Sequence, residues 1–297
     1  MTKKNLLFCD LYELYIQNCS LRLKENTLLT KKYIFSSRIL PYFGSMEITC
    51  IKPLDIQLWQ NHLATYNFST SYLTLITQQL SSFFNFAILY EYLQTNPCRN
   101  LLKRSNTRKT GKTFWTLDEY KQFISSISNA PRLHCAFQLL FWGGLRVGEL
   151  LALTAQDYDL NSKSLHITKS YQRLNKRDII TSPKNLSSYR TVTLPAFLAY
   201  ELQHLFILSS TTFRLFPYTK YSLRRYMLHY CRISGIDYIC IHNLRHSHAS
   251  LLFELGFSHK LISERLGHKK VETTINIYSH LYPNKQVALA KQLDELN

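Results

Sequence analysis

The chain has 297 residues, of which 36 are Lys or Arg and 19 are Asp or Glu, so its net charge is +17. Hydrophobic residues make up 45% and aromatic residues 13%, which argues against an intrinsically disordered chain, and the length allows two domains of ordinary size. The positive charge favours a polyanionic partner. Nucleic acid is the first candidate, because each phosphate that a protein contacts releases counterions.

Neither a membrane span nor a disulfide framework is expected. No run approaches the ~18 apolar residues of a membrane span, and Asp10 and Glu13 interrupt the apolar start that could otherwise suggest a signal peptide. The seven cysteines are odd in number and scattered, without a CxxC pair. We therefore expect reduced thiols in a cytoplasmic protein.

The first hundred residues show helical periodicity in four stretches. The first begins near Leu6, and the second, "ENTLLTKKYIFSSRIL", is expected to end at Pro41 and Gly44. The third is "PLDIQLWQNHLA", with Pro53 in its first turn, and a long fourth covers 69–93. These stretches predict a compact helical domain over residues 1–98.

Residues 99–112 differ in composition, since they hold no acidic residue and many basic ones. Such a segment is either a solvated tether or one that lies along DNA phosphates, so that two domains clamp a duplex. We favour the second interpretation because of the overall charge. The predicted DNA-binding residues of this linker are Arg99, Lys103, Arg104, Arg108, Lys109 and Lys112.

A second domain is predicted over residues 113–297. Thr116 and Glu119 form the pattern of a capping box, and the apolar helix 131–142 should stop at Gly143 and Gly144. Three β-branched segments, "SLHITKS", "RDIITSPK" and "YRTVTLP", predict one small antiparallel sheet, after which helices return from Ala196 to the end. The predicted fold class is mainly α with a small antiparallel β-sheet (α+β).

Two cations in this domain are candidates for phosphate binding. Arg146 precedes an apolar helix whose first turn holds Glu149, and its planar guanidinium can bind two phosphate oxygens at once. Lys184 lies in a turn between two predicted strands, where its flexible stem could reach into a cleft. Taken alone, such residues are more often surface charges or, for Arg146, a partner of Glu149.

His242 and Arg245 lie three residues apart and so share one face of a helix. An imidazole beside a permanent cation suits binding and proton chemistry at a phosphate. His246 and His248 allow a metal-binding alternative, but no acid or cysteine cluster nearby would complete the coordination. We therefore expect no metal.

A fourth stretch is "LGHKKVETTINIYSH", residues 266–280, in which His268 follows Gly267 and Tyr278 comes ten residues later. An isolated tyrosine of this kind more often packs in a core than reacts. Because motifs with Arg146, Lys184, His242 and Arg245 precede it in the chain, we expect Tyr278 to react rather than to pack in a core.

In chain order, the candidates resemble the active-site residues of the tyrosine recombinases, the phage integrase family. The similarity rests on "GLRVGELLAL", "HNLRHSHASLL" and the stretch 266–280, and it covers residues from about 8 to 290. Two positions depart from the family pattern. Asn243 stands where Asp is common, and Tyr189 stands where a basic residue is frequent, which is expected to weaken one phosphate contact.

The resemblance implies a helical core-binding, SAM-like DNA-binding domain over 1–98 and a tyrosine-recombinase catalytic domain over 113–297. It also implies a site-specific recombinase that cleaves and rejoins DNA through a 3′-phosphotyrosyl intermediate, for a mobile element or for plasmid or chromosome resolution. Tyr278 would be the nucleophile and Glu149 would orient its neighbours. The implied catalytic residues are Arg146, Lys184, His242, Arg245, His268 and Tyr278.

The resemblance further implies double-stranded DNA and a homotetramer on that DNA as partners, with accessory DNA-bending or directionality proteins as additional ones, and no cofactor. The C-terminal segment 284–297 is expected to dock on a neighbouring protomer. The alternative is a non-catalytic, helix-turn-helix-like DNA-binding regulator built on 258–280. That alternative leaves Arg146, Lys184 and the sheet without a role. A type IB topoisomerase would share the chemistry but act as a monomer.

Overall fold

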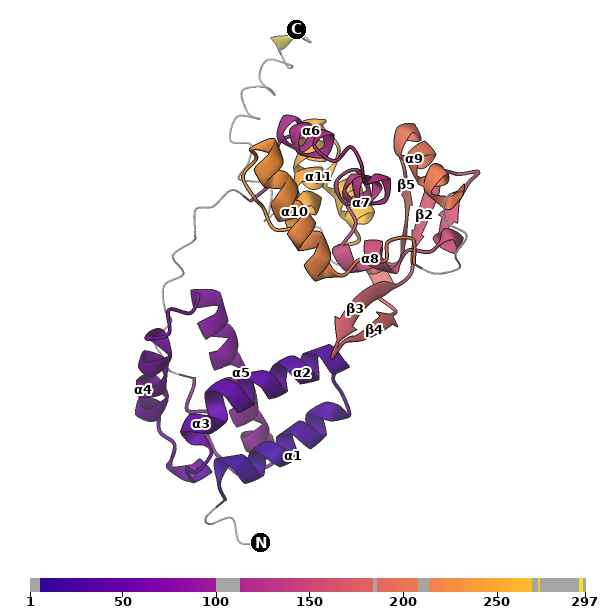
Figure 1. Ribbon diagram of the computed structural model, residues 1–297. Helices are drawn as coiled ribbons and strands as arrows, with labels where there is room; N and C mark the ends of the chain where they lie inside the picture. Colours follow the sequence, from indigo (N-terminus) through magenta and orange to yellow (C-terminus); the bar gives the residue numbers. More distant parts are fainter. Residues whose placement is uncertain are drawn as a thin grey trace. The chain divides into compact units, whose positions relative to one another are not determined.

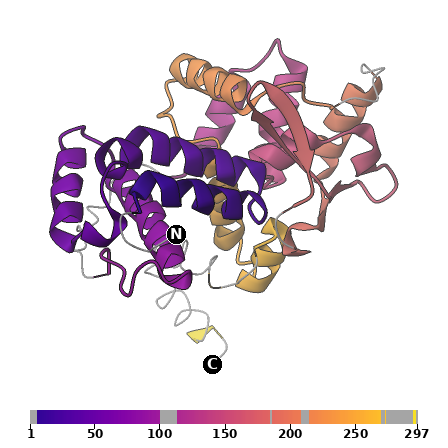
Figure 2. The ribbon, with the colours of Figure 1, turned by 90° about the horizontal axis from the view of Figure 1, so that it is seen from below.

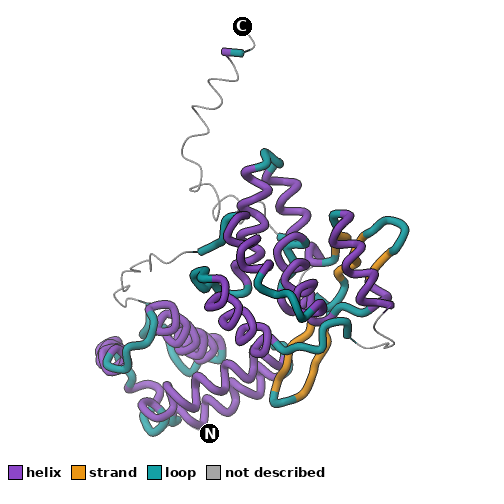
Figure 3. Tube along the Cα trace, turned by 45° about the horizontal axis from the view of Figure 1, so that its top comes forward, coloured by secondary structure: helices purple, strands orange, loops and turns teal. Residues whose placement is uncertain are grey.

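The computed structural model describes residues 6–99, 113–183, 186–207, 214–268, 272 and 294–295. The chain divides into two compact units, the N-terminal unit Met1–Thr110 and the C-terminal unit Gly111–Asn297. Helices dominate both units, and the described strands all belong to the C-terminal unit (Figure 3).

The N-terminal unit contains the four expected helical stretches. Helices α1 and α2 lie side by side, as the two indigo helices in Figure 2 show. A π-helical stretch, Phe35–Ile39, joins α2 to α3, and a short 3₁₀ turn, Ile48–Cys50, precedes α4. The helices are α1 (Phe8–Ser20), α2 (Glu25–Ile34), α3 (Leu40–Phe43), α4 (Pro53–Ala64) and α5 (Thr70–Leu89).

Aromatic side chains fill the core of this unit. The rings of Phe8 and Phe83 have centroids 4.3 Å apart, and Phe43 meets Trp59 edge-on at 5.3 Å. All four side chains are fully buried. Because aromatic side chains bury the most apolar area per residue, this cluster supplies much of the unit's stability.

The second helical stretch runs through Pro41 and ends at Gly44, so of the two residues expected to end it only Gly44 does. Proline has no backbone N–H, but Pro41 lies in the first turn of α3, where no intrahelical bond requires one. The chain widens into the π-helical stretch Phe35–Ile39 just before it, so the helical path continues through Pro41 as far as Phe43. Pro53 lies in the first turn of α4, as expected.

The C-terminal unit begins with helices whose ends match the sequence pattern. The capping box of Thr116 and Glu119 is present at the start of α6 (Leu117–Ser125). Helix α7 (Pro131–Trp142) ends at the two glycines, and Gly144 has a φ of +61°. A Cβ there would lie 2.6 Å from the His248 ring, so the turn needs glycine. Helix α8 (Val147–Ala152) follows at once.

The strands form two sheets rather than the single sheet that we predicted. The first sheet has the antiparallel order β1-β2-β5. A separate hairpin pairs β3 with β4 (Figure 1). Asn175 and Lys176 both have positive φ, 48° and 63°, which makes a tight two-residue turn and folds "RDIIT" back on β3. The strands are β1 (Tyr158–Asp159), β2 (Ser164–Ile167), β3 (Ser170–Leu174), β4 (Arg177–Thr181) and β5 (Arg190–Thr193).

The regular elements that follow β5 in the described C-terminal unit are all helices. Helix α7 lies at the centre of this unit, where α9 and α11 pack against it. In the described ranges, no helix has both the length and the apolar content that crossing a membrane requires. The four later helices are α9 (Ala196–Ile207), α10 (Lys220–Ser234), α11 (His242–Glu254) and α12 (His259–Leu266).

Candidate active site

The C-terminal end of α12 is the structural centre of the candidate site. Gly267 adopts the left-handed conformation, with φ +65°, and the backbone N–H of His268 donates to the carbonyl of Ser263 at 3.0 Å. A Cβ at Gly267 would lie 2.8 Å from the Ser187 carbonyl oxygen, so a larger residue would clash as well as strain the backbone. The carbonyls of the last turn are left available for side-chain donors.

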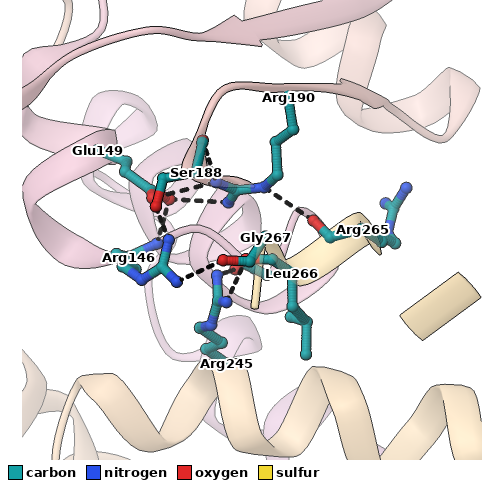
Figure 4. A network of polar contacts seen from close by, with 9 residues as sticks. Arg146, Glu149, Ser188, Arg190, Arg245, Arg265, Leu266 and Gly267 are labelled. Atoms are coloured by element: carbon teal, nitrogen blue, oxygen red, sulfur yellow. Dashed lines mark hydrogen bonds and ion pairs between the residues drawn. The ribbon is translucent and has the colours of Figure 1, made fainter. Parts of the chain in front are cut away.

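Three arginines donate to three successive carbonyls of this turn (Figure 4). Arg190 Nε donates to the oxygen of Arg265 at 2.8 Å, and Arg146 Nη2 to that of Gly267 at 2.9 Å. Arg245 Nη2 donates to the Leu266 oxygen between them. The negative end of the helix dipole favours cations at this place.

Glu149 links two of these arginines. Its Oε1 accepts from Arg146 Nη1 at 2.7 Å and from Arg190 Nη1 at 3.1 Å, and its Oε2 accepts from Arg190 Nη2 at 2.8 Å. Burial alone would raise the pKa of this carboxyl group, but the hydrogen bond and charge of Arg190 and the charge of Arg146 outweigh that effect and lower the pKa to about 2. Glu149 is therefore ionised at neutral pH.

The charge balance of these four side chains suits a phosphodiester undergoing attack. Three guanidinium groups and one carboxylate leave two positive charges. A phosphodiester carries one negative charge and gains a second as its phosphorus becomes five-coordinate, so two positive charges match the transition state better than the ground state. Arg146, with a third of its side chain (33%) exposed, faces solvent most openly, whereas Arg245 is only 2% exposed.

The histidines around the arginines are neutral near pH 7. Partial burial and the charges of Arg245 and Arg146 lower the pKa of His268 to about 4, and the same causes lower the pKa of His242. The ring of His246 lies edge-on to that of His242, with centroids 5.2 Å apart, and burial lowers its pKa to about 4. A neutral imidazole can donate with one nitrogen and accept with the other, as proton relay requires.

Acid should destabilise the C-terminal unit through His248. This side chain is 3% exposed, and burial together with the charges of Arg265 and Arg245 lowers its pKa from 6.5 to about 3. Between these values the unfolded chain binds a proton that the folded chain does not, so the free energy of unfolding falls as the pH falls. At about pH 4.5 the loss attributable to His248 is roughly 3 kcal/mol.

Urea unfolding of the full chain between about pH 7 and pH 4.5 tests this expectation. Tryptophan fluorescence reports on both units, because Trp115 and Trp142 belong to the C-terminal unit and Trp59 to the other. His248→Gln keeps an acceptor for Arg265 Nε and should reduce the pH dependence of unfolding, with the remainder due to His246 and His268. The same replacement at exposed His229 should not, and an unchanged slope in His248→Gln would refute the assignment.

The structure brings five of the candidate residues into one neighbourhood: Arg146, Glu149, His242, Arg245 and His268. Two predicted catalytic residues, Lys184 and the nucleophile Tyr278, lie outside the described residues, as does most of the segment 284–297. Of the predicted linker residues only Arg99 is described, and it is exposed. The remaining five lie outside the described ranges: Lys103, Arg104, Arg108, Lys109 and Lys112.

Arg190 is a residue of the site that sequence reasoning missed. Tyr189, the position singled out in the sequence, is 45% exposed, while its neighbour Arg190 contacts Glu149 in the arginine cluster. The period of two along β5 could have indicated this, because Arg190 shares a strand face with the fully buried Val192. In the described part of the chain, no three His, Cys, Asp or Glu side chains gather as a metal site.

A helical unit, a mixed unit and a cluster of arginines and histidines suited to a phosphodiester define a class of DNA breaking and rejoining enzymes, the tyrosine recombinases. Residues 113–285 match the family model described as "Phage integrase family", and residues 7–64 match "Phage integrase, N-terminal SAM-like domain". The chain belongs to the phage integrase family, whose members are tyrosine-type site-specific recombinases.

Individual relatives include an integrase and a transposase. The chain is 34% identical to the ICEBs1 integrase of Bacillus subtilis (strain 168) over 99% of its own length and 84% of that protein. It is 31% identical to transposase A from transposon Tn554 of Staphylococcus aureus, over 62% of this chain and 52% of the transposase.

Solved structures show the same fold. The Tn1549 transposon integrase in complex with a circular intermediate DNA superposes with a TM-score of 0.85, at 20% identity, over 96% of this chain and 98% of that one. A lambda integrase dimer bound to a COC′ core site gives a TM-score of 0.71, at 19% identity, over 92% and 95% of the two chains. The predicted fold class is thereby confirmed.

Proposed function

We propose that this protein is the site-specific recombinase of a mobile element, and that it cleaves and rejoins double-stranded DNA through a 3′-phosphotyrosyl intermediate. The observation that carries the proposal is the set of three arginines on the last carbonyls of α12, with one carboxylate among them. The mobile-element role is supported by the similarity to the ICEBs1 integrase and to transposase A from Tn554.

The proposed reaction starts with the phenolic oxygen of Tyr278, which attacks the scissile phosphorus while His242 accepts or relays its proton. The bond between phosphorus and the 5′ oxygen breaks, and Lys184 supplies the proton that this oxygen takes as it leaves. The aryl phosphodiester conserves the energy of the broken bond. The released 5′-hydroxyl can therefore attack it in turn and rejoin the strand without ATP.

The remaining residues stabilise the charge that develops on the phosphate. Arg146 and Arg245 would each bind a non-bridging oxygen, and neutral His268 would donate a further hydrogen bond. Glu149 orients Arg146 through the contact at 2.7 Å. The low pKa of Glu149 supports this role, because a carboxylate that stays ionised holds its arginine over the whole working range of pH.

Assembly and organisation are part of the same proposal. Residues 1–98 would be the core-binding domain, 99–112 a basic linker along the DNA, and 113–297 the catalytic domain, acting together as a tetramer on DNA in the cytoplasm. Lambda integrase has been solved as a tetramer bound to a Holliday junction, which supports a tetramer here. The segment 284–297 would dock on a neighbouring protomer, and accessory DNA-bending or directionality proteins would set the direction of exchange.

A suicide DNA substrate tests the proposal. The substrate carries its recombination core site and a nick close to the cleavage point, so that a short fragment diffuses away after cleavage and rejoining fails. The wild-type protein should become covalently joined to the 3′ end of the cleaved strand, visible as a shifted band under denaturing conditions. A regulator of the helix-turn-helix type would bind this DNA and give no adduct.

A further inference from the structure

Arg190 is placed to act on other residues rather than on DNA. Its side chain is 6% exposed, and all three guanidinium nitrogens donate to the protein itself. Nη1 also reaches the carbonyl of Ser188 at 3.2 Å, and the Cδ of Arg190 lies 3.1 Å from where a Cβ of Gly267 would be. Since Nε, Nη1 and Nη2 all have protein acceptors, two of them on one carboxylate, we expect Arg190 to influence the reaction through these partners rather than through a contact with phosphate.

Its first partner is Glu149, and the two arginines share that carboxylate unequally. Arg190 contacts both carboxylate oxygens, whereas the side chain of Arg146 contacts only Oε1. The second oxygen accepts instead from the backbone N–H of Arg146 at 2.9 Å. Arg190 thus takes up the edge of the carboxylate with which Arg146 could otherwise form a two-bond pair.

Its second partner is the carbonyl of Arg265, one residue before the carbonyl that holds Arg245 and two before the carbonyl that holds Arg146. Arg190 therefore ties the start of β5 to the turn on which both other arginines rest (Figure 4). Without Arg190, this turn would lose a hydrogen-bond donor, and Glu149 would keep only one of its two arginine partners, Arg146.

We propose that Arg190 is a positioning residue of the recombinase: by occupying Glu149 and the last turn of α12, it limits the Arg146 side chain to one hydrogen bond with Glu149, directs it toward the scissile phosphate and keeps the local net charge positive. The balance of charge explains the effect. Arg146, Glu149 and Arg190 sum to one positive charge, and without Arg190 the sum is zero, because Glu149 then neutralises Arg146. This inference rests on the proposed recombinase function.

A kinetic double-mutant cycle on full-length protein tests the inference, with single-turnover cleavage of the suicide substrate as the readout. In the otherwise wild-type chain, Arg190→Ala should slow cleavage by about 30-fold and change DNA affinity by less than about threefold. In an Arg146→Ala background, the same change should slow cleavage by less than about threefold, because the residue it acts through is gone. The trapped adduct accumulates, so slow variants can be followed for a day.

Arg190→Lys supplies a second variant in case the alanine variant fails to fold. A lysine keeps the charge near Glu149 but cannot span both carboxylate oxygens and a carbonyl, so its cleavage rate should fall between wild type and alanine. The matched control is Lys169→Met. Lys169 lies 2.8 Å from buried Asp157 and donates to Thr154, so its loss removes a cation from a carboxylate elsewhere in the unit and should leave the cleavage rate unchanged.

Three outcomes would contradict the proposal that Arg190 acts by positioning Arg146. An equal slowing in both backgrounds would mean that it acts independently of Arg146. Full rescue by a substrate with sulfur in place of the scissile 5′ oxygen would mean that it acts on the leaving group, since a thiolate leaves without a general acid. A loss of DNA affinity with unchanged cleavage would make it a binding residue. The absence of an adduct with wild-type protein would instead refute the proposed function itself, and this inference with it.

Discussion

Tyr278→Phe should abolish the covalent protein–DNA adduct and leave DNA affinity within about twofold of wild type. The substitution removes one oxygen atom and keeps the ring, so it is conservative in shape but takes away the atom that the proposed reaction joins to phosphorus. We expect no adduct with the suicide substrate even after a day, which corresponds to a loss of at least about 10⁴-fold in rate. Gel electrophoresis under denaturing conditions measures the adduct, and a filter-binding assay measures affinity.

The same segment supplies a matched control. Tyr282 lies four residues after Tyr278, and Tyr282→Phe should still form the adduct at near the wild-type rate. If Tyr282→Phe lost the adduct and Tyr278→Phe kept it, the nucleophile would be Tyr282. Digestion of the trapped complex with a protease, followed by mass spectrometry of the DNA-linked peptide, identifies the attached tyrosine independently.

Elements set by local sequence were predicted well. The helices of the N-terminal unit follow from an apolar period near 3.6, and the capping box at Thr116 follows from two side chains three residues apart. Pro41 was misjudged, because a π-helical stretch placed just before a proline is decided by how the neighbouring side chains pack. Local patterns carry no information about that packing.

The sheet was predicted less well, since strand pairing depends on partners distant in sequence. Strand β3, "SYQRL", has no β-branched residue, and it forms because the turn at Asn175 and Lys176 brings β4 against it. The sequence supplied the strand segments β2, β4 and β5 but could not say which of them would pair. One predicted sheet therefore became two.

In the candidate site, too, contacts between residues close in sequence could be predicted and contacts between distant residues could not. Arg146 and Glu149 are three residues apart at the start of one helix, so their contact could be expected from the sequence. Arg190 meets the carbonyl of Arg265, which is 75 residues away, and only the folded chain brings them together. The roles of Lys184 and Tyr278 stay predictions, because they rest on the resemblance in sequence alone.

Arg146→Ala should slow cleavage by about 10³-fold while leaving the fold nearly intact, which makes it the most informative change among the arginines. A preorganised donor to a developing negative charge contributes this much in other enzymes, about 4 kcal/mol. The fold should tolerate the loss because the side chain is 33% exposed. Glu149 also keeps its two hydrogen bonds to Arg190, so no buried carboxylate is left without a cation.

A modified DNA substrate can show whether Arg146 acts at the scissile phosphate or elsewhere. A methylphosphonate at the scissile position replaces one non-bridging oxygen by a methyl group and removes the negative charge. If Arg146 binds that oxygen, Arg146→Ala should cost far less on one of the two methylphosphonate stereoisomers than on the natural phosphate, because the wild-type protein gains nothing from the missing contact. A loss of about 10³-fold on all three substrates would place the action of Arg146 elsewhere, in DNA binding or in assembly.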